Sequence, residues 1–160
     1  MGRVTGFRKS QQRGMTLVEL IVAFTILGLL TTMAVPLARY KVRRDKERDL
    51  VYALREIRKA IDDYKDAALA GKIQVKLGTE GYPAKLEDLV EGVDLVQSAE
   101  KKKIKFLRRI PLDPMTGTRD WGLRSMQDDP NSTAWGGQNV FDVYTKSTER
   151  ARDGTPYSQW

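Results

Sequence analysis

The chain has 160 residues and a formal net charge of +7, with no cysteine and no histidine. Its length allows one small domain together with a short anchor. The missing residue types exclude thiol chemistry, imidazole catalysis and zinc sites built from Cys or His. The charge is uneven, because the first 14 residues carry Arg3, Arg8, Lys9 and Arg13 without an acid. It therefore does not by itself indicate a nucleic-acid-binding protein.

The first predicted element is an apolar segment that follows this basic stretch. Residues 15–38 contain one charged residue, Glu19. A helix over this range would be roughly 36 Å long, enough to cross a bilayer core of about 30 Å. A carboxylate at a bilayer centre costs about 2.5–3.5 kcal/mol, so an acid in such a helix needs a partner. The segment runs into the cations of 39–44 without a small-residue cleavage site, so we expect it to be retained.

The helical pattern continues beyond the apolar segment. Apolar residues recur every three or four positions over 50–68, and charged residues occupy the opposite face. The sequence therefore predicts one helix from Met15 to Ala70, ended by Gly71 and kinked at Pro36. The apolar stripe is Leu50, Leu54, Ile57, Ile61, Tyr64 and Ala68, and the charged face is Arg55, Glu56, Arg58, Lys59, Asp62, Asp63 and Lys65.

Shorter elements are expected in the rest of the chain. A small amphipathic helix is predicted at Ala84–Val90, and a basic helical or extended piece at 99–109. Aromatic and β-branched residues gather at Trp121–Ser125 and Asn139–Thr145, which predicts two short strands. The tail 146–160 has no periodicity. The predicted class is α+β, with a long N-terminal helix packed on a small antiparallel sheet and a C-terminal loop.

The most specific motif is the heptapeptide Arg13-Gly14-Met15-Thr16-Leu17-Val18-Glu19, which opens the apolar segment. It resembles the processing site of type IV pilin-like proteins, the pilins and the pseudopilins of type II secretion. The resemblance implies that a prepilin peptidase cleaves between Gly14 and Met15, that Met15 is then N-methylated, and that Glu19 is the fifth mature residue. Gly28 and Pro36 fall where pilins commonly carry these residue types.

The resemblance also implies a domain organisation and a function. Residues 1–14 would be a cleaved basic leader, 15–38 a transmembrane and filament-core helix, and 39–160 a periplasmic pilin-like globular domain. The subgroup looks like the major pseudopilin of type II secretion, from the Ile110–Pro114 segment, a Trp-Gly pair, a Phe-Asp-Val strand and Trp160.

Such a subunit is structural and non-enzymatic, and it helps to export folded proteins as part of a periplasmic filament. It sits in the inner membrane in contact with lipid, and it polymerises with itself and with minor pseudopilins on an inner-membrane assembly platform. Two alternatives stay open: a type IV pilus or DNA-uptake pilin, and a monomeric single-span anchor that carries a binding domain.

Glu19, Gly28 and Pro36 are the candidate assembly residues. Glu19 either interacts favourably with the helix dipole in the first turn or forms an ion pair with the α-ammonium of Met15 on a neighbouring subunit. The resemblance favours the second interpretation. The segment with Gly28 and Pro36 is either a plain span with one kink or, as the resemblance to assembled pili implies, a segment that loses helix when subunits leave the membrane. Gly entropy and the hydrogen bond that Pro lacks make this loss less costly here than elsewhere.

Two further features can be interpreted either as binding sites or as ordinary parts of the protein surface. The first is a basic cluster that could bind DNA through phosphate contacts: Lys101, Lys102, Lys103, Lys105, Arg108 and Arg109. It contains one aromatic residue, too few for a surface on which several bases stack. A solvated face that contacts acids of a neighbouring subunit is therefore favoured, and no nucleic acid is expected. Major pseudopilins often bind calcium in their last loop through Asp side chains and backbone carbonyls. Here the stretch 145–154 has more cations than acids, which leaves Asp153 as the candidate ligand and a simple Asp-Gly turn as the alternative.

Overall fold

A computed structural model describes residues 15–96 and 102–160 of the chain. The described residues divide into an N-terminal unit that ends at Val42 and a globular unit from Arg43 to Trp160. The predicted leader, with Gly14, and the first residue of the basic cluster, Lys101, lie outside the described residues.

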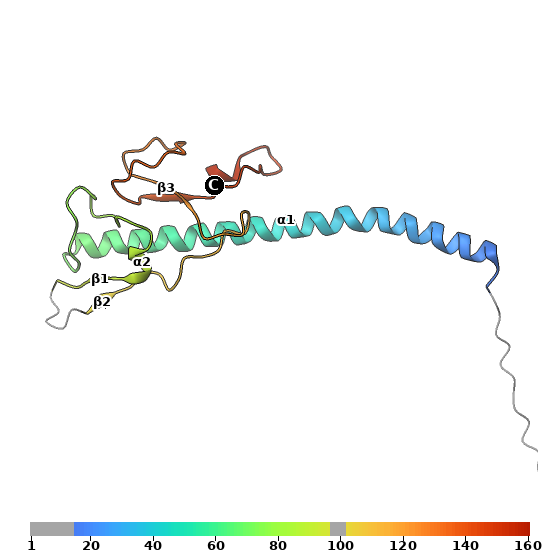
Figure 1. Ribbon diagram of the computed structural model, residues 1–160, viewed down its shortest axis with the longest axis horizontal. Coiled ribbons are helices and arrows are strands. Elements are labelled where there is room, and N and C mark those ends of the chain that lie inside the picture. The colour runs from blue at the N-terminus through green and yellow to red at the C-terminus, as the bar shows by residue number, and fades with distance from the viewer. Residues whose placement is uncertain (1–14, 97–101) are drawn as a thin grey trace, which may run out of the picture. The chain divides into compact units, whose positions relative to one another are not determined.

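The longest element is helix α1, Leu17–Leu69, which contains 53 residues (Figure 1). It begins where the Thr16 hydroxyl accepts a hydrogen bond from the Glu19 amide, at 3.3 Å, as an N-cap residue does. It ends where Gly71 adopts a φ of 66°, a left-handed conformation that side chains other than glycine's disfavour. The helix is continuous through Pro36. The predicted helix over Met15–Ala70 is therefore confirmed to within two residues at each end.

Hydrogen bonds beyond the last turn explain the abrupt end of α1. The amide of Gly71 donates to the carbonyl of Ala68, and the amide of Lys72 donates to the carbonyl of Ala67, both at 3.0 Å. This pair of bonds is the Schellman motif, which satisfies carbonyls that a helix end would otherwise leave free.

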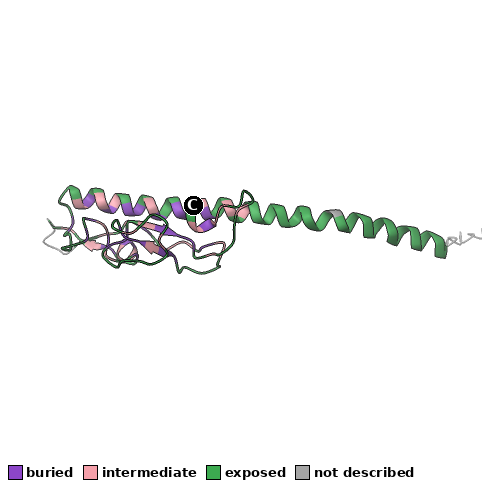
Figure 2. Cartoon of the chain, turned by 90° about the horizontal axis from the view of Figure 1, so that it is seen from above, coloured by how far each residue is buried: buried purple, intermediate pink, exposed green. Residues whose placement is uncertain are grey.

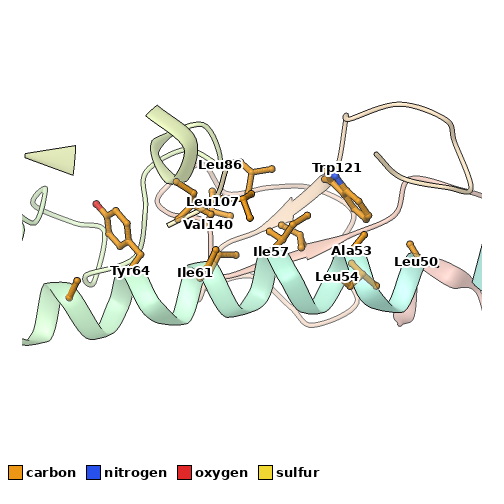
Figure 3. Close-up of a cluster of buried hydrophobic side chains, with 14 of the residues drawn as sticks. Leu50, Ala53, Leu54, Ile57, Ile61, Tyr64, Leu86, Leu107, Trp121 and Val140 are labelled. Atoms are coloured by element: carbon orange, nitrogen blue, oxygen red, sulfur yellow. The ribbon is translucent and has the colours of Figure 1, made fainter. Parts of the chain in front are cut away.

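The core of the globular unit is built on the predicted apolar stripe of α1. Figure 2 shows buried residues along one side of the helix in this unit, and Figure 3 shows the stripe facing side chains from the later loops and strands. Each fully buried aliphatic side chain stabilises the fold by about 1.5–3 kcal/mol. The stripe contributes Leu50, Leu54, Ile57, Ile61 and Tyr64, and the covering layer contributes Leu86, Leu107, Trp121 and Val140.

Helix α2, Asp88–Glu91, is shorter than the predicted Ala84–Val90. The residues before it form a turn, in which the Asp88 carboxylate accepts the Lys85 amide at 3.2 Å. Gly92, with a φ of 82°, ends the helix. The carbonyl of Leu89 accepts the amides of Phe106 and Leu107 instead of continuing a helical ladder. The helix is short because it begins four residues later than predicted, while its end at Glu91 lies one residue beyond the predicted end.

The strands form two separate two-stranded antiparallel sheets in place of the single small sheet that the sequence predicted. Strand β1, Val93–Asp94, pairs with β2, Lys103–Ile104. Strand β3, Gly122–Arg124, pairs with β4, Asp142–Tyr144, and Leu123 lies opposite Val143. The two predicted strands are confirmed in a shorter form, and the basic piece 99–109 is extended in its described part. The tail contains a 3₁₀ turn, η1, Tyr157–Gln159.

Candidate functional site

The start of α1 presents the one acid of the apolar segment close to the predicted new N-terminus. Glu19 lies in the first turn, where a negative charge is favourable to the helix dipole. Met15 and Glu19 are both exposed. The Glu19 carboxylate makes no ion pair with any described residue. The geometry leaves this carboxylate available to a group from outside the chain.

Threonine hydroxyls in the apolar segment of α1 find their acceptors within the helix. The hydroxyls of Thr25, Thr31 and Thr32 donate to backbone carbonyls three or four residues earlier, at 2.7–2.8 Å. Such bonds let hydroxyl side chains sit in an apolar environment. Gly28 has open space where a Cβ would stand, and Pro36 lies inside the helix. The helix is continuous across both residues.

The basic cluster is a surface feature in its described part. Lys102, Lys103, Lys105, Arg108 and Arg109 are exposed. The apolar residues between them point inward: Leu107 is buried, and Phe106 packs on Tyr64 with ring centroids 5.3 Å apart. The aromatic ring of this cluster is thus used in the core, which removes it as a stacking surface for a base.

Sequence reasoning missed an ionic network at the centre of the globular unit. It placed Arg58 on the charged face opposite the apolar stripe without a partner, and in the structure the Nε of Arg58 donates to the carboxylate of Asp142 at 2.7 Å. Arg124, whose side chain is buried, lies 3.4 Å from the other oxygen of Asp142. Arg58 also reaches the carbonyl of Trp160 at 2.7 Å. The network joins α1, β3, β4 and the tail, and no local pattern in the sequence signals it.

Asp113 is fully buried in the turn that follows Pro111. Its carboxylate accepts hydrogen bonds from the Thr145 hydroxyl at 2.5 Å and from the Met115 amide at 2.8 Å. A buried carboxylate is tolerated only when such donors satisfy it. Asp113 therefore ties this turn to the end of β4 and has a structural role in the fold.

The C-terminal loop holds the candidate calcium ligand, Asp153. Its carboxylate accepts the Thr155 amide at 2.9 Å, and this bond lowers the pKa of the carboxyl. The loop carbonyl of Gly154 accepts the Arg150 guanidinium at 3.1 Å. The carbonyl of Arg150 in turn accepts the guanidinium of Arg43 from α1.

These contacts do not fit a calcium site. Calcium takes six to eight oxygen ligands, whereas two carbonyls of this loop are already bound by arginine. Within the described residues, no three acidic side chains gather closely enough to hold a metal ion. The Asp-Gly turn is the better description of Asp153.

Comparisons with known proteins agree with the N-terminal motif. Residues 9–35 match the family described as the prokaryotic N-terminal methylation motif. The match includes the predicted cleavage site, Glu19 and Gly28, and ends just before Pro36. Type II secretion system core protein G of Escherichia coli (strain K12) is 33% identical over 109 residues, which cover 65% of this chain and 67% of that protein. No solved structure matches the chain.

Proposed function

The chain belongs to the type IV pilin-like family, and on that premise we propose that it is a structural subunit of the pseudopilus of a type II secretion system. Its similarity to a protein named as core protein G of such a system carries the proposal. The chain is a structural protein of this family and not an enzyme. The globular unit lies in the periplasm, and the apolar part of α1 anchors the subunit in the inner membrane before assembly.

The exposed apolar surface of α1 supports polymerisation. Each side chain described between Leu17 and Val42 is exposed, and this part of the helix is long and apolar enough to cross a membrane. Burying apolar surface stabilises by about 25 cal/mol per Å². Lipid covers this surface in the membrane, and α1 helices of neighbouring subunits cover it in the filament.

Glu19 sets the register between subunits in this proposal. After cleavage, the α-ammonium of Met15 enters the same apolar surroundings as the carboxylate. Two opposite charges in a medium of low dielectric constant attract each other strongly, and either one alone is costly to bury. A pair between Glu19 of one copy and Met15 of the next therefore selects one axial offset. N-methylation leaves the amine able to carry its charge.

The intact mass of the protein tests the processing step. We expect membranes that contain an active prepilin peptidase to yield a chain without residues 1–14, with or without one added methyl group. A matched sample without peptidase is the control, and it should give the full-length mass. A full-length product in the presence of active peptidase contradicts the proposal and leaves the single-span anchor as the better description.

One alternative use of the same fold is a DNA-uptake pilin, for which the exposed cations of 102–109 argue. Such a protein is processed in the same way, so the mass measurement does not separate the two functions. DNA binding that weakens steeply with salt would favour the uptake function, because phosphate contacts release counterions. Binding to minor pseudopilins and to the assembly platform of a secretion system would favour the proposed function in secretion.

A further inference from the structure

The loop of residues 150–156, here called the C-terminal loop, is closed by its own backbone. Arg150 and Pro156 form an isolated antiparallel bridge. The Ala151 amide donates to the Thr155 carbonyl at 2.8 Å, and the Gly154 amide donates to the Ala151 carbonyl at 3.0 Å. The loop leads directly into η1, in which Tyr157 is fully buried. Its order therefore decides how the end of the chain packs.

A guanidinium from α1 joins this loop to the helix. The Nε of Arg43 donates to the Tyr157 hydroxyl at 3.0 Å, and its Nη2 donates to the carbonyl of Arg150. The Tyr157 hydroxyl donates to the carboxylate of Glu47 at 2.6 Å, and that carboxylate lies 3.5 Å from Arg43. One cation, whose side chain is 46% exposed, thus contacts a carbonyl and a hydroxyl from the end of the chain and a carboxylate from its own helix.

We propose that Arg43 is the resident cation of the C-terminal loop, so that the loop is ordered by a guanidinium and needs no calcium. The oxygen ligands around Arg43 are of the type that a hard metal ion prefers. A guanidinium is charged at all physiological pH values and directs its donors in a fixed fork, so it can bind two acceptors at once. Arg150 supplies a second cation by donating to the Gly154 carbonyl at 3.1 Å.

The charge of the stretch 145–154, which overlaps the C-terminal loop, agrees with this assignment. Between Thr145 and Gly154 the cations are Lys146, Arg150 and Arg152, and the acids are Glu149 and Asp153. A divalent cation would enter a region that is already positive, while its nearest acid is engaged with the Thr155 amide. The guanidinium of Arg43 instead gains a carboxylate of its own, since Glu47 lies one helical turn further along α1.

Hydrogen–deuterium exchange of the full-length chain in detergent tests the proposal. The reporters are the amides of Ala151, Gly154 and Tyr157, which are hydrogen-bonded within the loop and to the Glu149 carbonyl. We expect the unmodified protein to give the same exchange rates in calcium and in EDTA. In Arg43→Gln, exchange of these amides should rise by roughly tenfold or more, because bonds to a charged donor are lost.

Arg44→Gln is the matched control, since the Arg44 side chain is exposed and makes no hydrogen bond or ion pair with the described residues. The amide of Val140, bonded to the Pro83 carbonyl at 2.8 Å, reports on the rest of the globular unit. Slower loop exchange in calcium overturns the proposal, and that arm of the experiment needs no variant. Unchanged loop exchange in Arg43→Gln also overturns it. The proposed function stands or falls separately, because this measurement uses the unassembled chain.

Discussion

The two halves of α1 have opposite relations to the rest of the chain. From Leu17 to Ala38 the helix is apolar apart from Glu19, and its described side chains are exposed as far as Val42, whereas from Leu50 onward a single stripe is buried in the globular unit. Leu27 is 63% exposed and Ile57 is fully buried, although both are aliphatic residues of one continuous helix. The apolar surface of the first half is free to contact other molecules, whereas the apolar stripe of the second half is covered by the globular unit.

Substitution of Glu19 should have the largest effect, because it removes the one charge of the apolar segment 15–38. We expect Glu19→Leu to abolish assembly and to leave the globular unit folded. Breaking a buried ion pair by removing one partner costs about 3–5 kcal/mol at each subunit contact. Cross-linking of subunits in membranes measures assembly, and thermal unfolding measures the fold.

The matched control for Glu19 is Glu56→Leu, which removes an exposed acid from the second half of the same helix. This variant should still form cross-linked oligomers. Normal cross-linking of Glu19→Leu would contradict the assembly role of Glu19, whereas an absence of cross-links in the unmodified protein would favour a monomeric anchor.

Truncation of a core residue in the second half of α1 should destabilise the globular unit, whereas the same truncation in the first half should not. We expect Ile57→Ala to lower the free energy of unfolding of the globular unit by about 2–5 kcal/mol, through lost apolar burial and the cavity that remains. Leu27→Ala deletes a similar side chain from the exposed half and should leave this free energy unchanged. Denaturant unfolding of the solubilised chain measures both.

A similar loss of stability in Leu27→Ala and Ile57→Ala would mean that the first half packs on its own domain. That result would remove the distinction between the two halves. Tyr52→Ala provides a second control, since Tyr52 is 64% exposed although it lies on the second half. Its effect should stay within about 0.5 kcal/mol.

The ionic network of the second half predicts an intermediate effect. In Asp142→Asn, Arg58 and Arg124 lose the carboxylate that they share. We expect the free energy of unfolding to fall by about 1–3 kcal/mol, as for polar groups left without a partner in a partly buried site. Asp120→Asn removes a surface pair with Lys146 and should cost less than about 1 kcal/mol. Equal effects of the two substitutions would mean that the network adds nothing beyond a surface ion pair.

The helix was predictable from sequence because both of its halves carry local signals. A long apolar run marks the first half, and the spacing of Leu50, Leu54, Ile57 and Ile61 marks the second. The cap at Thr16 and the stop at Gly71 also depend on neighbouring residues alone. The motif around Glu19 is equally local, which is why the family was recognisable without the structure.

The other contacts could not be predicted in this way, because residues distant in the chain determine them. Arg58 has the same periodicity as the solvated cations around it, and only the fold brings Asp142 to it. The carbonyl of Leu89 accepts the amides of Phe106 and Leu107, which only the fold brings to it. The role of Arg43 likewise depends on a loop at the far end of the chain.

The smallest predicted effect is a loss of stability at high pH that involves Tyr157. Burial, together with the hydrogen bond to Glu47, raises the pKa of its hydroxyl, and Arg43 acts against this rise. The folded state therefore holds the proton more tightly than the unfolded state, in which the pKa is about 10. The resulting stabilisation is complete below the unfolded pKa and is lost as the pH rises through the folded one. Denaturant unfolding on both sides of that range measures the loss.

Tyr157→Phe isolates the contribution of this hydroxyl. Burial also raises the pKa of Tyr64, so the variant should keep part of the loss at high pH and lack the part that belongs to Tyr157. The variant should also be less stable at neutral pH, because Arg43 and Glu47 lose the hydroxyl between them. An unchanged pH dependence in Tyr157→Phe would mean that this hydroxyl titrates alike in both states. The contact between Tyr157 and the second half of α1 would then contribute nothing to stability through this proton, and in this respect the second half would not differ from the first.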